Sequence, residues 1–91
     1  GVGMPMFGFG FRDRAIPPTS EDIAKAWGPY VETCIELFGS KRCMFESNFP
    51  VDRSSFSHHL LWNGFKRYAA NFSPAEKAAL FHDNAKRIYR I

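Results

Sequence analysis

The residues whose types and spacing could do chemistry are concentrated between Arg42 and Asp52. A short apolar run over residues 43–45 is followed by Glu46, Asn48 and Asp52. The run is too short for a helix and stops abruptly at Asn-Phe-Pro, which predicts a buried strand that ends in a loop. In α/β enzymes, the side chains that act on substrates lie at the carboxyl ends of parallel strands. We therefore predict that Asn48 marks the rim of an active site.

Helix-like segments flank this stretch and would have to position it. Thr19 or Ser20 can cap a helix over residues 20–39, which would end at Gly39. Pro29 inside this range predicts a kink, or a short helix followed by a second one. Residues 42–48 are the predicted strand, and residues 1–19, rich in Gly, Phe and Pro, are a predicted loop.

The C-terminal part, residues 54–91, is predicted to consist of helices. Ser54 or Ser55 can cap the first of them. Residues 73–76, Ser-Pro-Ala-Glu, combine an N-cap serine, a proline at the first helical position and a capping-box glutamate, the clearest helix start in the chain. Asp83 or Asn84 is predicted to cap a last short helix.

The composition limits the classes of protein to which the chain can belong. It has 91 residues, a formal net charge of +3, 45% hydrophobic and 16% aromatic residues, which argues against disorder. Its basic residues are scattered, so we expect no nucleic-acid partner. No apolar run approaches the ~20 residues of a membrane helix, so we expect no membrane partner. Cys34 and Cys43 are predicted to be free thiols in a reducing cytoplasm.

The chain contains ten Phe and two Trp, which together carry more apolar surface than a small domain is expected to bury. Because the sequence also starts at Gly1 rather than Met, we expect it to have been processed or cut from a longer chain. The Phe-rich arm over residues 1–18 leaves three readings open: a hydrophobic flap on a neighbour, an active-site loop, or a surface that stacks on bases.

Two segments resemble the C-terminal third of the amidohydrolase-related family of TIM-barrel enzymes. Residues 38–50, Phe-Gly-Ser-Lys-Arg-Cys-Met-Phe-Glu-Ser-Asn-Phe-Pro, are similar to the family's last barrel strand and the loop after it. Residues 84–91, Asn-Ala-Lys-Arg-Ile-Tyr-Arg-Ile, resemble its terminal helix. The resemblance implies an α/β fold, the C-terminal portion of a (β/α)8 TIM barrel with its last one or two strands and three to four helices.

By this resemblance, residues 1–91 form one segment of a single catalytic domain. Gly1 to Met4 would end the seventh strand, residues 5–18 would form its loop on the catalytic face, and residues 42–48 would be the eighth strand. A complete barrel needs ~250 residues, so the rest of the barrel would lie outside this chain.

The family includes metal-dependent hydrolases, decarboxylases and lactonases, and the resemblance puts Asn48 where they usually have an aspartate. That aspartate binds the metal or takes a proton from the attacking water. Asn48 carries no charge and cannot accept the proton. A divalent metal of the Zn or Mn type is therefore held more weakly, or is not used, or a nearby carboxylate replaces the aspartate.

Glu46 and Asp52 are the candidates for that carboxylate. Strand side chains alternate, so Met44, Glu46 and Asn48 share the face that would point into the barrel. Three readings of Glu46 stay open: a structural carboxylate paired with an internal base, a catalytic or ligating group, or a residue that faces outward. Asp52 could reach the rim from the following loop.

The leading hypothesis is a hydrolase in which water attacks an ester, lactone or amide of a small carboxylated or cyclic compound. Asn48, Glu46 and Asp52 are assigned to catalysis, with Asn48 also at the position of the metal ligand. Arg12, Arg14 and Phe49 are assigned to substrate binding, because guanidinium groups pair well with anionic groups. The alternative is a small helical interaction module that docks through its Phe-rich arm. A homo-oligomer is compatible with either hypothesis.

Overall fold

The computed structural model describes residues 9–91, and the first long element in them is helix α1, Ser20–Phe38. A capping box begins it: the Thr19 hydroxyl accepts a hydrogen bond from the Asp22 N–H at 3.1 Å, and the Asp22 carboxylate accepts from the Thr19 N–H at 2.9 Å. The helix ends at Gly39, which has a φ of 80° and donates to the Ile35 carbonyl at 2.7 Å. Of the two alternatives expected at Pro29, the split into two helices is wrong, because α1 continues through this residue as one helix.

The second long helix, α2, covers His58–Tyr68 and starts later than the sequence predicts. The expected caps, Ser54 and Ser55, are not used, because a 3-10 helix η3, Val51–Ser54, occupies this part of the chain. Ser57 caps α2 instead, with its hydroxyl accepting from the Leu60 N–H at 3.1 Å.

The last helical run combines α3, Pro74–Ala78, a π-helical turn η4, Ala79–Asp83, and α4, Asn84–Tyr89. The predicted capping box of Ser73 starts it, with reciprocal hydrogen bonds of 3.1 and 3.2 Å to Glu76. The separate cap expected at Asp83 or Asn84 is wrong, because Asp83 has helical dihedral angles and makes no side-chain cap. The chain therefore stays helical across this junction.

The core lies between α1, α2 and η4, with the segment after α1 against them. Gly64 of α2 lets the two long helices approach closely, since a Cβ there would lie 2.8 Å from Cγ2 of Ile23. The Trp27 ring packs on Phe65, with ring centroids 4.2 Å apart. The buried cluster comprises Ile23, Trp27, Val31, Cys43, Phe45, Phe56, Leu61, Phe65, Ala69 and Leu80.

The predicted strand over residues 42–48 is not formed in the described part of the chain. Arg42 ends a 3-10 helix η2, Ser40–Arg42, and the residues after it are extended. The Phe45 N–H donates to the carbonyl of Leu80, a residue of η4, at 2.9 Å. A ladder needs a neighbouring strand, and this segment has only helices beside it within residues 9–91.

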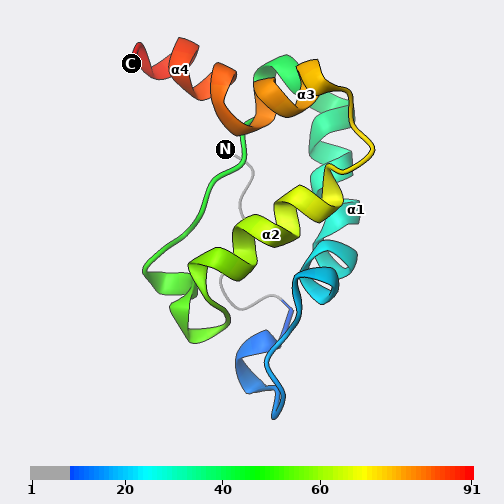
Figure 1. The fold of residues 1–91 in the computed structure, drawn as a ribbon, viewed down its shortest axis with the longest axis vertical. Coiled ribbons are helices and arrows are strands. Elements are labelled where there is room, and N and C mark those ends of the chain that lie inside the picture. Colours follow the sequence, from blue (N-terminus) through cyan, green and yellow to red (C-terminus); the bar gives the residue numbers. More distant parts are fainter. Residues whose placement is uncertain (1–8) are drawn as a thin grey trace.

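Figure 1 shows how this extended segment is placed: it runs from the end of the molecule that holds α3 toward η3, and α2 then returns in the opposite sense. Of the predicted α/β fold, residues 9–91 therefore show the helices but not the strand. The strand end expected at Gly1 to Met4 lies outside the described residues. None of the helices in residues 9–91 has the length and apolar character needed to cross a membrane.

Candidate functional site

The extended segment after η2 begins buried and becomes accessible at Glu46. Cys43 and Phe45 belong to the buried core, and the Phe45 ring lies against Phe65 and Phe81 with centroid distances of 4.3 and 4.8 Å. Glu46 is exposed, and Asn48 is half-buried. The strict alternation expected of an extended chain is not present here, because Met44 is also buried, at 8% exposure, although it lies outside the core cluster that contains Cys43 and Phe45.

The loop after this segment is closed by reciprocal hydrogen bonds between Asn48 and Asp52. The Asn48 N–H donates to Oδ2 of Asp52 at 3.1 Å, and the Asp52 N–H donates to the Asn48 carbonyl, also at 3.1 Å. The Asp52 carbonyl in turn accepts from the N–H groups of Ser55 and Phe56, at 2.9 and 3.1 Å. Because Phe56 lies in the core, Asp52 connects the backbone of Asn48 to the packed interior.

Asp52 is an unusual residue for an exposed loop, since only 1% of it is accessible. Its Oδ1 is buried and has no hydrogen-bond partner among residues 9–91. Burial raises the pKa of the Asp52 carboxyl, and the hydrogen bond from the Asn48 N–H opposes part of this rise. The structure places Asp52 beneath the loop rather than on its rim.

Phe49 continues the loop toward the N-terminus of α2. Its ring packs on Phe56 at 6.4 Å and meets the His58 ring edge-on at 5.0 Å. His58 is itself held by Trp62, whose Nε1–H donates to Nε2 of His58 at 2.9 Å. The predicted substrate-binding residue Phe49 is thus half-buried beside an exposed imidazole that the sequence analysis did not assign to the site.

The two arginines of the predicted substrate site lie in or beside the 3-10 helix η1, Phe11–Asp13. The Phe11 ring packs edge-on against Phe56 at 6.5 Å, which brings η1 to the same end of the molecule as the Asn48–Asp52 loop (Figure 1). Arg12 is exposed on η1. Arg14 pairs with Asp22 through Nη1 and Oδ2 at 3.3 Å, so this guanidinium already has an anionic neighbour.

Asn84 and Arg87 fix the other end of the extended segment, a role that was not predicted for them from the sequence. Nδ2 of Asn84, a residue that is 1% exposed, donates to the carbonyls of Ser40 and Cys43, both at 2.6 Å. Nη2 of Arg87 donates to the Lys41 carbonyl at 2.5 Å. The sequence signal for this clamp is the Asn-Ala-Lys-Arg spacing itself, which puts both donors on one side of α4.

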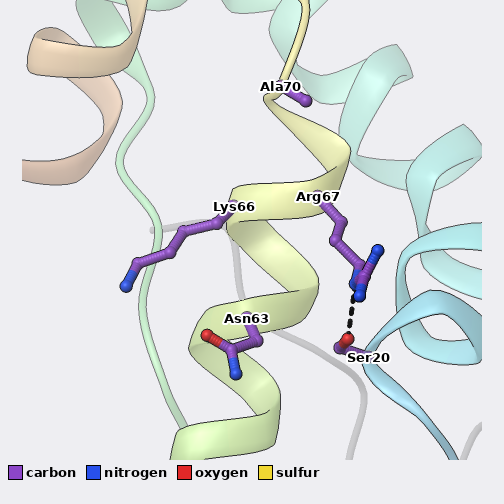
Figure 2. A pocket seen from close by; sticks show the side chains of 5 residues that line it. All are labelled: Ser20, Asn63, Lys66, Arg67 and Ala70. Carbon is purple, nitrogen blue, oxygen red and sulfur yellow. Dashed lines mark hydrogen bonds between the residues drawn. The ribbon is translucent and has the colours of Figure 1, made fainter.

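A separate hollow of about 430 Å³ lies beside α2 and the start of α1, lined by Ser20, Asn63, Lys66, Arg67 and Ala70. Figure 2 shows Arg67 directed at Ser20, to which its Nε–H donates at 2.6 Å, while Lys66 extends the other way. The two cations do not converge, so the hollow is not built to hold an anion.

The residues in the described part of the chain do not form a metal site by themselves. No three His, Cys, Asp or Glu side chains within residues 9–91 come together to hold an ion. Asn48 offers a neutral carboxamide oxygen, and the Asp52 carboxylate is turned to the Asn48 backbone. Any divalent metal would need ligands from elsewhere in the protein.

With this geometry in place, comparison with known proteins identifies the class. The chain belongs to the amidohydrolase family, whose model matches residues 6–91, and the resemblance seen in the sequence is confirmed. It is 51% identical over 73 residues, or 80% of its length, to the uncharacterized protein y4mH of Sinorhizobium fredii. The chain spans only 23% of that relative. No solved structure matches the chain significantly.

The family assignment supports a relationship to hydrolases and implies a TIM-barrel context for these helices. Members of the family often use divalent metals, although none of the described side chains cluster as a metal site. The small interaction module considered as an alternative receives no support from the family assignment.

Proposed function

We propose that this chain is the C-terminal part of a TIM-barrel hydrolase in which water attacks an ester, lactone or amide of a small carboxylated or cyclic compound. The observation that carries the proposal is the change from buried to accessible side chains along residues 43–48. Cys43 and Phe45 belong to the helical core and Met44 is buried outside that cluster, whereas Glu46 is exposed and Asn48 is half-buried. In a barrel, the face opposite the helices is the interior, where a pocket would open.

Exposed apolar side chains support a larger body around these helices. Leu37 and Phe38 at the end of α1 are 75% and 53% exposed, and Ile88 and Tyr89 of α4 are 50% and 64% exposed. Isolated exposed apolar residues are ordinary, but paired ones at two helix ends indicate surfaces that pack against further protein. We propose that the preceding part of the protein supplies the other barrel strands.

In this proposal Asn48 and Glu46 have different chemical roles. The Asn48 carboxamide orients the attacking water or the substrate carbonyl, since it can both donate and accept hydrogen bonds. The Glu46 carboxylate accepts one proton as the water oxygen bonds to the acyl carbon. The bond from that carbon to the leaving oxygen or nitrogen then breaks, and Glu46 returns the proton to the leaving group. A neutral Asn48 leaves Glu46 as the carboxylate on this face.

Substrate binding is assigned to Arg12, Arg14 and Phe49 at the same end of the molecule. A substrate carboxylate can displace Asp22 from Arg14 at little cost. Their side chains are 40% and 42% exposed, and exposed ion pairs contribute little to the free energy of unfolding. A bidentate guanidinium–carboxylate contact is stronger and directional. Phe49 would supply an apolar wall for a cyclic substrate.

The test uses the full-length protein, a panel of lactones, esters and amides, and added Zn²⁺ or Mn²⁺. Glu46→Gln is expected to lower kcat by about 10²–10⁴-fold, the usual contribution of a general base. Glu36→Gln, at an exposed position of α1, is the matched control and should retain the activity. Asn48→Asp is expected to change the rate or the metal content.

Two results would refute the proposal. One is a protein that hydrolyses nothing in the panel with or without metal. The other is a hydrolase in which Glu46→Gln and Asn48→Ala both keep the kcat/KM of the parent protein, since the face opposite the helices would then take no part in the reaction.

A further inference from the structure

We infer that Asp52 is a positioning residue that acts through Asn48, and that its carboxylate does not itself touch the substrate. This inference rests on the proposed function of Asn48. It begins from the contact between the two residues: the carboxylate receives the Asn48 N–H at 3.1 Å, and the Asp52 N–H donates back to the Asn48 carbonyl at the same distance. Both backbone groups of Asn48 are therefore occupied by one partner.

Burial decides between a catalytic and a positioning role. Asp52 is 1% exposed, whereas Asn48 on the other side of the contact is half-buried and Glu46 is exposed. A group that accepts a proton from substrate or water must be within hydrogen-bond reach of it. The carboxylate lies beneath the loop, so the reachable group at this place is the carboxamide that it supports.

The hydrogen bonds of Asp52 also show to what Asn48 is attached. The Asp52 carbonyl accepts from the Ser55 and Phe56 N–H groups, and the Phe56 side chain is 7% exposed in the core. Asn48 is thus linked through one residue to a packed aromatic side chain. Loops gain the precision that a site needs from such supporting bonds, because a misplacement of about 1 Å can cost about 10²-fold in rate.

The second observation that supports a positioning role is the buried Oδ1 atom of Asp52, which lacks a hydrogen-bond partner among residues 9–91. A buried polar atom left in this way is costly. An apolar residue at this position would avoid that cost, so the carboxylate is explained by what Oδ2 does for Asn48. Burial also raises the pKa of the Asp52 carboxyl, which is consistent with this site being dry.

The decisive comparison in the full-length protein is Asp52→Asn against Asp52→Ala. Asparagine keeps a carbonyl oxygen that can accept the Asn48 N–H, and alanine does not. We expect Asp52→Ala to lower kcat about 10- to 100-fold with a smaller change in KM, and Asp52→Asn to recover most of that loss. Asp52→Ala combined with Asn48→Ala should be no slower than Asn48→Ala, because the carboxamide that Asp52 positions is already absent from Asn48→Ala.

Hydrogen exchange at the backbone N–H of Asn48 provides a readout that does not need catalysis. The amide should exchange slowly in the parent protein and in Asp52→Asn, and faster in Asp52→Ala. Asp52→Asn also keeps the test open if Asp52→Ala does not fold. If the parent protein proves inactive, the proposed function fails, and the exchange rates still decide whether Asp52 holds Asn48.

Three results would overturn the inference. Asp52→Asn as slow as Asp52→Ala would mean that the carboxylate itself takes part in the reaction. Additive losses in the double variant would mean that the two residues act independently. Equal exchange of the Asn48 amide in all variants would mean that the hydrogen bond does not hold the loop.

Discussion

Replacing Asn84 with alanine is expected to destabilise the protein more than its place in a short helix suggests. Asn84 is 1% exposed, and its Nδ2 donates to the carbonyls of Ser40 and Cys43, each at 2.6 Å. Alanine removes both donors and leaves two carbonyl oxygens without them, one fully buried and one partly buried. Each buried group left unsatisfied costs about 1–3 kcal/mol.

The net effect follows from these costs and the helix propensity. Alanine is the better helix former and recovers at most about 0.7 kcal/mol. Because the Ser40 carbonyl is only partly buried, its loss falls at the low end of the range. The unfolding free energy is therefore expected to fall by about 1–4 kcal/mol.

Urea denaturation of the full-length protein, followed by tryptophan fluorescence, measures this loss, since Trp27 is 1% exposed in the same core. The matched control is Asn63→Ala, also within a helix, where the lost contact is the exposed one from Nδ2 to Nε2 of His59 at 3.1 Å. The control should change the unfolding free energy by less than about 0.5 kcal/mol. A loss below about 1 kcal/mol for Asn84→Ala, or equal losses in the two variants, would refute the buried clamp.

Three further predictions concern the helices. Gly64→Ala should lower the unfolding free energy by about 1–3 kcal/mol in the same urea assay, because its Cβ would lie 2.8 Å from Cγ2 of Ile23 and overpack the crossing of α1 and α2; an unchanged midpoint would contradict this contact. Ser73→Ala should cost about 0.5–2 kcal/mol by removing the capping box with Glu76, and Ser73→Asp should restore most of it. Burial, with smaller contributions from two nearby glutamates, raises the pKa of Tyr68 from 10.0 to about 12. The unfolded phenol ionises first, so the unfolding free energy should fall as pH rises between these values, and Tyr68→Phe should reduce this slope.

Local sequence chemistry is sufficient for the helix starts at Thr19 and Ser73, because each cap is satisfied by a residue three positions later. It does not decide the outcome at Pro29, whose local cost of about 3 kcal/mol or more favours a kink or a division into two helices. The buried residues Ile23, Trp27 and Val31 lie on both sides of this proline and pack in one core, which holds α1 together. Tertiary packing outweighs local propensity there.

The candidate site divides in the same way. The contrast between buried Phe45 and exposed Glu46 agrees with the alternation expected of an extended chain, but the burial of Met44 does not. Whether residues 42–48 form a strand was not predictable from these residues alone, because a strand exists only when a neighbouring strand completes its hydrogen bonds. Within residues 9–91 the segment bonds to the Leu80 carbonyl instead, which belongs to a helical turn.

The sequence by itself determined the family, the capped helix starts at Thr19 and Ser73, and the place of Asn48 after an apolar run. Only the tertiary structure decided that Asp52 faces the Asn48 backbone, that Arg14 meets Asp22, and that Asn84 holds the carbonyls of Ser40 and Cys43. The physical reason is that a polar side chain can reach many partners in an extended chain. Folding selects the one that is buried with it, because an unpaired polar group in the interior is costly.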